Sequence, residues 1–192
     1  SESVIQAEAT ITVIVDPLPT VGDITSARVV PGAVTLEPDH SWVLSAFGMD
    51  EDGNIVPASA SWEVVDLRAG SIDSLGIFTA GHEPGVYPNA VRAWFVQEDG
   101  SQGTMAEAFT TVNILGPLVR VEVVPSTVTL EAGQSIRMIA VGYDANALEL
   151  PSLRVRWTMQ NPRAGTIDGS GMLTAGVDVG TFENAVQVEA AE

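Results

Sequence analysis

The chain of 192 residues contains no cysteine and no lysine, and these two absences exclude two kinds of covalent cross-link. Without cysteine no disulfide can form, and without lysine no Lys–Asn isopeptide bond can form. The eight basic residues are all arginine. The stability of the fold must therefore come from burial of apolar side chains and from pairing of strands.

Positive charge is scarce: 8 basic residues stand against 25 acidic ones, the formal net charge is −17 and the sequence pI is about 4.1. Nucleic acid is therefore not an expected partner, because phosphate contacts need clustered Lys and Arg. Anionic membrane surfaces are disfavoured for the same reason. Two interpretations of the acidity stay open, namely solubility through mutual repulsion and adaptation to a saline or cation-rich exterior.

Long hydrophobic runs are also absent. No stretch of about 18 apolar residues occurs, so we expect no membrane insertion. The chain does not open with a basic segment followed by an apolar core, the pattern of a secretory signal. If the protein is extracellular or at the cell surface, as suggested below, the signal peptide has already been removed from this sequence.

Residues with typical catalytic chemistry are few. The only histidines are His40 and His82, which lie about 40 residues apart without the spacing of a zinc site or a partnered Ser-His-Asp triad. No glycine-rich phosphate loop follows a strand and opens a helix. We therefore predict that the protein is not an enzyme and needs no cofactor.

What the sequence does contain is two copies of one unit, with a period of roughly 95 residues. The matching segments are Val-Val-Pro at 29–31 and 123–125, Val-Thr-Leu-Glu at 34–37 and 128–131, Trp62 and Trp157, Ala-Gly-x-Ile-Asp at 69–73 and 164–168, and Asn-Ala-Val at 89–91 and 184–186. The repeat divides the chain into an N-terminal extended strand (1–16), a linker (17–23), unit 1 (24–116) and unit 2 (117–192).

Each unit is predicted to be a β-sandwich. Val, Thr, Gly and Pro are abundant, and turn residues recur at short intervals. In unit 1 we expect strands near 25–30, 33–37, 41–49, 59–65, 76–79, 88–97 and 105–115, and unit 2 repeats this order from about Leu118. Seven short strands at this spacing favour a sandwich over a parallel sheet. The short Gly116-Pro117 junction predicts a nearly fixed relation between the units.

The repeated positions resemble a known family. Val-x-Pro, a small-residue strand, a tryptophan, then Gly-x-Ile-Asp-x-x-Gly-x-Phe/Leu-Thr-Ala-Gly and Gly-x-Tyr/Phe-x-Asn-Ala-Val are similar to the bacterial Ig-like (BIG) domains of invasin- and intimin-like adhesins. The resemblance covers nearly all of both units. It implies two tandem Ig-like β-sandwiches, placement at the cell surface and no catalysis, but no particular ligand.

The last strand of the unit is displaced. Unit 1 closes with Ala-Glu-Ala-Phe-Thr-Thr-Val at 106–112, and unit 2 contains no such segment, whereas Ala-Glu-Ala-Thr-Ile-Thr-Val stands at 7–13. Residues 3–15 alternate as a strand with one buried face does. The side chains expected on that face are Ala7, Ala9, Ile11, Val13 and Val15. We therefore predict that unit 2 lacks its last strand and that residues 3–15 are a donor strand.

Three functional hypotheses follow. In the first, the donor strand enters unit 2 of another copy against Val186, Val188 and Ala190, and this head-to-tail contact builds a filament by donor-strand complementation. In the second, the chain is a segment of a longer tandem array, the stalk of a surface adhesin, and residues 1–16 end a preceding domain. In the third, it is a carbohydrate-binding or spacer module of a secreted enzyme.

Two further groups of residues have open interpretations. Asp50, Asp52 and Asn54 surround Gly53 as the oxygen ligands of a calcium loop do, but the distal Glu of an EF-hand is absent and a plain hairpin turn is the alternative. Trp42 and Trp94 have no aromatic counterpart in unit 2, so they are either core residues or a platform for stacking a sugar.

Overall fold

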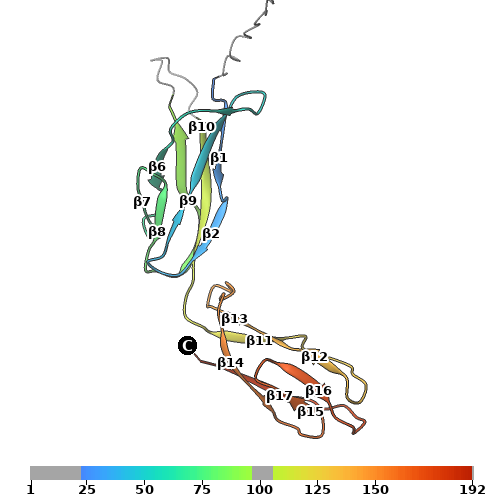
Figure 1. Ribbon diagram of the computed structural model, residues 1–192. Coiled ribbons are helices and arrows are strands. Elements are labelled where there is room, and N and C mark those ends of the chain that lie inside the picture. Colours follow the sequence, from blue (N-terminus) through green and yellow to red (C-terminus); the bar gives the residue numbers. More distant parts are fainter. Residues whose placement is uncertain (1–22, 97–105, 192) are drawn as a thin grey trace, which may run out of the picture.

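The computed structural model describes residues 23–96 and 106–191, and every regular element in them is a β-strand. Figure 1 shows two separate bodies of strands that follow one another along the chain and correspond to units 1 and 2. The fold is all-β and Ig-like, as predicted. Among these residues no helix has the length and apolarity of a membrane span.

Unit 1 is a sandwich of two layers. Its strands are β1 (Ser26–Val30), β2 (Ala33–Leu36), β3 (Ser41–Val43), β4 (Ser45–Met49), β5 (Ile55–Val56), β6 (Ser61–Val64), β7 (Gly70–Ile72), β8 (Ile77–Ala80), β9 (Gly85–Phe95) and β10 (Ala106–Ile114). One layer is the sheet β2-β10-β9-β6. The other contains β1-β4-β5 and β3-β8-β7, which are joined through the continuous β3 and β4 segment.

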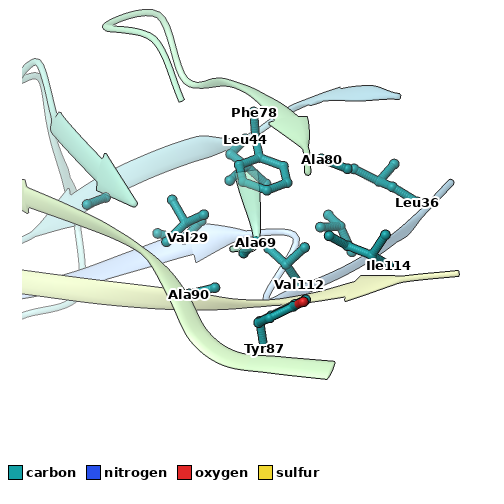
Figure 2. Packing of buried hydrophobic residues seen from close by; sticks show 13 residues of the cluster. Val29, Leu36, Leu44, Ala69, Phe78, Ala80, Tyr87, Ala90, Val112 and Ile114 are labelled. Carbon is teal, nitrogen blue, oxygen red and sulfur yellow. The ribbon is translucent and has the colours of Figure 1, made fainter. Parts of the chain in front are cut away.

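The core of unit 1 lies between these layers (Figure 2). Phe78, Leu44, Ile114, Val91 and Val112 are fully buried. Each such side chain contributes roughly 1.5–3 kcal/mol relative to an exposed one. These residues come from both layers, so burial of the alternating apolar face of each strand holds the two layers together.

Strand β10 is central to unit 1 because it has a neighbour on each side. It pairs antiparallel with β9 and parallel with β2. Its buried Thr110 hydroxyl donates to the carbonyl oxygen of Pro31 at 2.8 Å, and the Asn113 amide donates to the Thr35 hydroxyl at 3.1 Å. Strand β10 therefore ties β2 into the sheet.

Unit 2 repeats this plan with fewer strands. They are β11 (Arg120–Val124), β12 (Ser135–Arg137), β13 (Ile139–Tyr143), β14 (Arg154–Met159), β15 (Gly165–Ile167), β16 (Met172–Ala175) and β17 (Val186–Ala191). The pairings are β11-β13, β12-β16-β15 and β14-β17. By sequence position β17 corresponds to the second half of β9. Within residues 117–191 no strand corresponds to β2 or β10.

Three sequence expectations need correction. The strand expected at 41–49 is interrupted at Leu44, whose N–H donates to the carbonyl oxygen of Gly76 instead of to a strand partner in register. Residues 70–72, which lie outside the strands expected for unit 1, form β7, because Gly70 at φ 138° can bring its backbone close to Thr79. The strand expected at 127–131 in unit 2 is absent, for a reason that defines the site described next.

Candidate functional site

Among the described residues of unit 2, one edge of the β14-β17 sheet is open. Strand β17 pairs with β14 on one side, with Val186, Val188 and Ala190 opposite Met159, Trp157 and Val155. In unit 1 the other side of the corresponding strand carries β10. In the described part of unit 2 no strand lies there, so the backbone N–H and C=O groups on this side of β17 have no ladder partner.

Apolar residues of β17 are also less buried than their counterparts in β9. Val186, Val188 and Ala190 are half-buried, whereas their counterparts Val91, Ala93 and Phe95 are 0, 0 and 2 % exposed. The predicted acceptor residues thus lie where unit 2 leaves apolar surface uncovered. Apolar surface beside an unpaired strand edge is a template for pairing with another strand.

Two more segments of unit 2 are the counterparts of the parts of unit 1 that pair with β10. Residues 127–130 carry the Val-Thr-Leu of β2 but form no strand, and residues 180–185 repeat the first half of β9 without forming one. Val128 and Leu130 are half-buried, while Val34 and Leu36 are buried. We call residues 127–130, residues 180–185 and β17 together the acceptor groove. The repeat itself could have revealed it, since strands at both segments depend on the displaced one.

The predicted donor residues Ala7, Ala9, Ile11, Val13 and Val15 lie outside the described residues. Their placement therefore stays a prediction from the sequence match to β10 and from the edge of β17 that has no strand partner among the described residues.

The junction between the units is held by a buried carboxylate. Asp144 is 4 % exposed, and its Oδ2 accepts a hydrogen bond from the N–H of Gly116 at 2.9 Å. Its Oδ1 accepts from the N–H groups of Asn146 and Leu148. Burial opposes ionisation of Asp144, but these backbone donors outweigh it and lower the pKa of the carboxyl below its usual value. The junction residue is thus bonded to unit 2.

The loop suggested for calcium uses its carboxylate internally. Asp50 is buried and accepts hydrogen bonds from the N–H groups of Asp52 and Asn54 and from the Asn54 side chain, at 2.8–3.2 Å. Hydrogen bonds from Asn54 are the largest cause lowering the pKa of Asp50. Asp52 and Asn54 are exposed. Among the described residues no group of three or more His, Cys, Asp or Glu is placed to hold a metal ion.

The two unmatched tryptophans have different surroundings. Trp42 on β3 is 52 % exposed. Trp94 on β9 is half-buried, and the guanidinium carbon of Arg92 lies 5.0 Å from its ring centroid. Arg92 in turn pairs with Glu107, at 3.1 Å from Nε to the carboxylate. Of the two, Trp42 therefore offers the more accessible ring for stacking.

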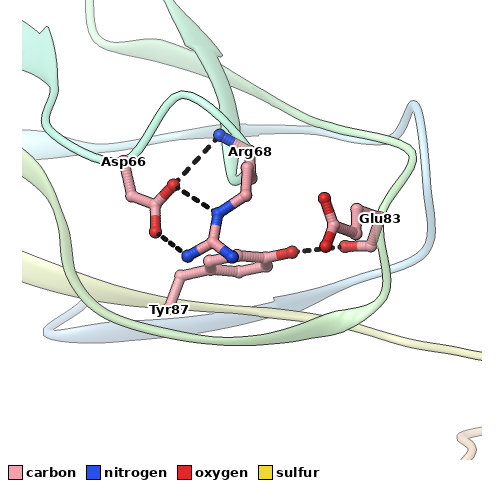
Figure 3. A network of polar contacts seen from close by, with 4 residues as sticks. All are labelled: Asp66, Arg68, Glu83 and Tyr87. Atoms are coloured by element: carbon pink, nitrogen blue, oxygen red, sulfur yellow. Dashed lines mark hydrogen bonds and ion pairs between the residues drawn. The ribbon is translucent and has the colours of Figure 1, made fainter.

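Tyr87, Arg68 and the two histidines have partners within unit 1. Tyr87 donates to the carbonyl oxygen of Glu83 at 2.8 Å while Arg68, paired with Asp66, lies over its ring (Figure 3). Burial raises the pKa of the Tyr87 hydroxyl. The exposed His40 and His82 lie 3.6 Å from Glu37 and 3.3 Å from Asp39, in two separate contacts with carboxylates.

Comparison with known proteins returns only distant similarity. No protein-family model matches the chain, and no curated protein matches it significantly. A structure of S-layer protein SbsC domains 4 and 5 is 13% identical with a TM-score of 0.44, covering 88% of this chain and 94% of that one. In a longer S-layer SbsC structure, also 13% identical and with a TM-score of 0.40, 90% of this chain matches about 27% of that chain.

A bacterial adhesin is among the other similar structures. Yersinia pseudotuberculosis adhesin InvE is 13% identical with a TM-score of 0.29, covering 88% of this chain and 52% of that one. Similarity at these levels does not transfer a function. The resemblance to bacterial Ig-like domains stays a prediction, while the Ig-like arrangement of strands is seen in the structure itself.

Proposed function

We propose that this chain is a non-enzymatic, extracellular structural protein whose unit 2 is completed by residues 3–15 of a second copy. Each copy then donates one strand and accepts another, and repetition of this head-to-tail contact builds a filament. The observation that carries the proposal is the acceptor groove, together with a segment at 7–13 whose sequence matches the strand that fills the same position in unit 1.

The expected energy of such a joint is substantial. A strand of this length would cover about 300–500 Å² of apolar surface, or on the order of 8–12 kcal/mol before the entropy of association is subtracted. Pairing would also give the free N–H and C=O groups of β17 their partners. A joint of this kind dissociates slowly.

A fold-back within one chain is disfavoured by distance. If residue 15 takes the position of Ile114, it lies beside the segment between β11 and β12, at the end of unit 2 away from β10, whereas β1 begins at the end of unit 1 far from unit 2 (Figure 1). The intervening segment, 16–23, spans at most about 28 Å when fully extended. Strand β9 alone, with 11 residues, is about 37 Å long. This distance favours a donor from outside residues 1–192 of the same copy over a fold-back.

The second candidate is the stalk of a surface adhesin. Residues 16–18, Asp-Pro-Leu, follow the donor segment as Gly116, Pro117 and Leu118 follow β10, so residues 1–16 also read as the end of a preceding unit in a longer polypeptide. In that case the acceptor groove is filled by a strand of the same polypeptide. Both candidates require the same completed sandwich, and they differ in which chain supplies the strand.

Electron microscopy and light scattering of the purified chain test the proposal. We expect filaments from the full chain and none after deletion of residues 1–16. Val13→Asp, on the face predicted to be buried, should abolish assembly, and the matched control Thr12→Asp, on the opposite face, should reduce it much less. A full chain that stays monomeric at high concentration contradicts the filament and favours the stalk.

A further inference from the structure

Unit 1 shows what the missing strand has to contact. Strand β10 binds two edges at once: Val112, Asn113 and Ile114 pair with β2 in parallel and with Gly85, Val86 and Tyr87 of β9 in antiparallel orientation. Its first half pairs with the second half of β9 only, which also has β6 as its other neighbour. The C-terminal half of β10 therefore has a pairing partner on each side, whereas its N-terminal half pairs with β9 alone.

Both segments that rely on β10 alone are strands in unit 1 and are not strands in unit 2. Among the described residues, strand β2 has no sheet neighbour besides β10, and residues 85–90 of β9 lie beyond the pairing of β9 with β6. Their counterparts, residues 127–130 and 180–185, keep Val-Thr-Leu and Gly-x-Phe-x-Asn-Ala but form no strand. By contrast, β17 has β14 as a neighbour and is a strand. The difference thus follows the availability of a partner, because the sequences are nearly the same.

We infer that the acceptor groove is a two-edged socket, in which the arriving strand converts residues 127–130 and 180–182 into strands as it binds. This inference rests on the proposed function and adds the partner surface and its register. With the donor in the place of β10, Ala7, Ala9 and Ile11 lie opposite Ala190, Val188 and Val186. Val13 and Val15 lie beside Val128 and Leu130 on the second edge.

Pairing with residues 127–130 is expected to fix the register of the donor strand. A strand added to β17 alone could slide by two residues and keep its apolar face inward. Simultaneous parallel pairing with 127–130 fixes the register, because Thr35 and Asn113 show that side chains on the outer face of this pair meet directly, at 3.1 Å. Their counterparts in the joint are Thr129 and Ile14.

The absence of cysteine allows a direct test by engineered disulfides, since paired strand residues have the Cα separation that a disulfide needs. The full chain carrying Ile14→Cys and Thr129→Cys probes the parallel edge. The chain carrying Thr10→Cys and Gln187→Cys probes the antiparallel edge. The matched controls are shifted by two residues, on the same faces: Ile14→Cys with Thr127→Cys, and Thr10→Cys with Glu189→Cys.

After mild oxidation we expect both in-register variants to give a ladder of covalent oligomers on a non-reducing gel, at least about tenfold more than their controls. If filaments form but only the Thr10 and Gln187 pair cross-links, or the shifted controls cross-link equally, the socket is wrong and the proposed function stands. If no variant forms either filaments or cross-links, both the socket and the proposed function are wrong. A cross-linked monomer shows fold-back and contradicts both.

Discussion

Units 1 and 2 have closely related sequences but differ in how completely they bury equivalent apolar side chains. Val34 and Leu36 are buried in β2, while Val128 and Leu130, in the same Val-Thr-Leu context, are half-buried and outside any strand. The local propensities of the two segments are alike, so the difference arises from the neighbour that one has and the other lacks. A strand at a sheet edge exists here only through pairing.

The comparison predicts first that the two cores differ in their response to truncation. Phe78 is fully buried, and Leu173, its counterpart on β16, is 8 % exposed. We expect Phe78→Ala to lower the free energy of unfolding of unit 1 by about 3–5 kcal/mol, and Leu173→Ala to cost unit 2 about 2 kcal/mol. Urea unfolding of the donor-deleted chain, followed by the tryptophans, measures both. Equal losses would mean that unit 2 is as closed as unit 1.

The second prediction concerns the two equivalent buried carboxylates. Asp144→Ala removes the acceptor for the N–H groups of Gly116, Asn146 and Leu148, which we expect to cost about 1–3 kcal/mol and to free the junction. Asp50→Ala is the matched control, because the hydrogen bonds of the Asp50 carboxylate within residues 23–96 and 106–191 all lie in its own loop. Small-angle X-ray scattering should show a broader range of shapes for the Asp144 variant alone. Identical scattering curves for the two variants would show that Asp144 does not hold the junction.

Acid should act on the same carboxylate. Since hydrogen bonding lowers the pKa of Asp144 in the folded state, its contribution to stability is complete above the unfolded value of about 3.9 and is lost as the pH falls through the lower folded value. We expect the stability of unit 2 to decline below about pH 4, and Asp144→Asn to flatten that decline. An unchanged pH profile in the variant would assign the loss to other groups.

The fourth prediction tests the bond between β10 and the turn before β2. Thr110→Val keeps the shape of the side chain but leaves the carbonyl oxygen of Pro31 without its hydroxyl donor, so we expect unit 1 to lose about 1 kcal/mol. Thr111→Val, at the neighbouring half-buried position, should change the stability by less. Thermal unfolding of both variants gives the comparison. A silent Thr110→Val would mean that β2 is held by backbone pairing alone.

The smallest expected effect is electrostatic. In unit 1 Glu107 lies against Arg92, whereas in the proposed joint Glu8 would face Glu189 and Gln187 replaces the arginine. Like charges across a strand pair are unfavourable, so Glu8→Gln should lower the concentration at which filaments appear by about two- to five-fold. Light scattering at low salt measures this. A rise in that concentration would contradict the register.

Much of the fold could be predicted from the sequence because the repeat shows each element twice. Alternation and turn residues located most strands of unit 1, and the displaced Ala-Glu-Ala segment indicated the open edge. The interruption at Leu44 was not predictable, because it depends on a hydrogen bond to Gly76 that is distant in sequence. The role of Asp144 at the junction was likewise not predictable. Asp144 occupies the same position in the repeat as Asp50, and only the structure shows that it accepts a hydrogen bond from the N–H of Gly116.

Hydrogen exchange at residues 34–36 and 128–130 tests the central claim most directly, because the two segments have the same sequence. In the full chain at concentrations that allow assembly, we expect the amides of both segments to be protected. After deletion of residues 1–16, protection should persist at 34–36 and be lost at 128–130. Equal exchange of 128–130 in the full and shortened chains would contradict completion of unit 2 by a donated strand.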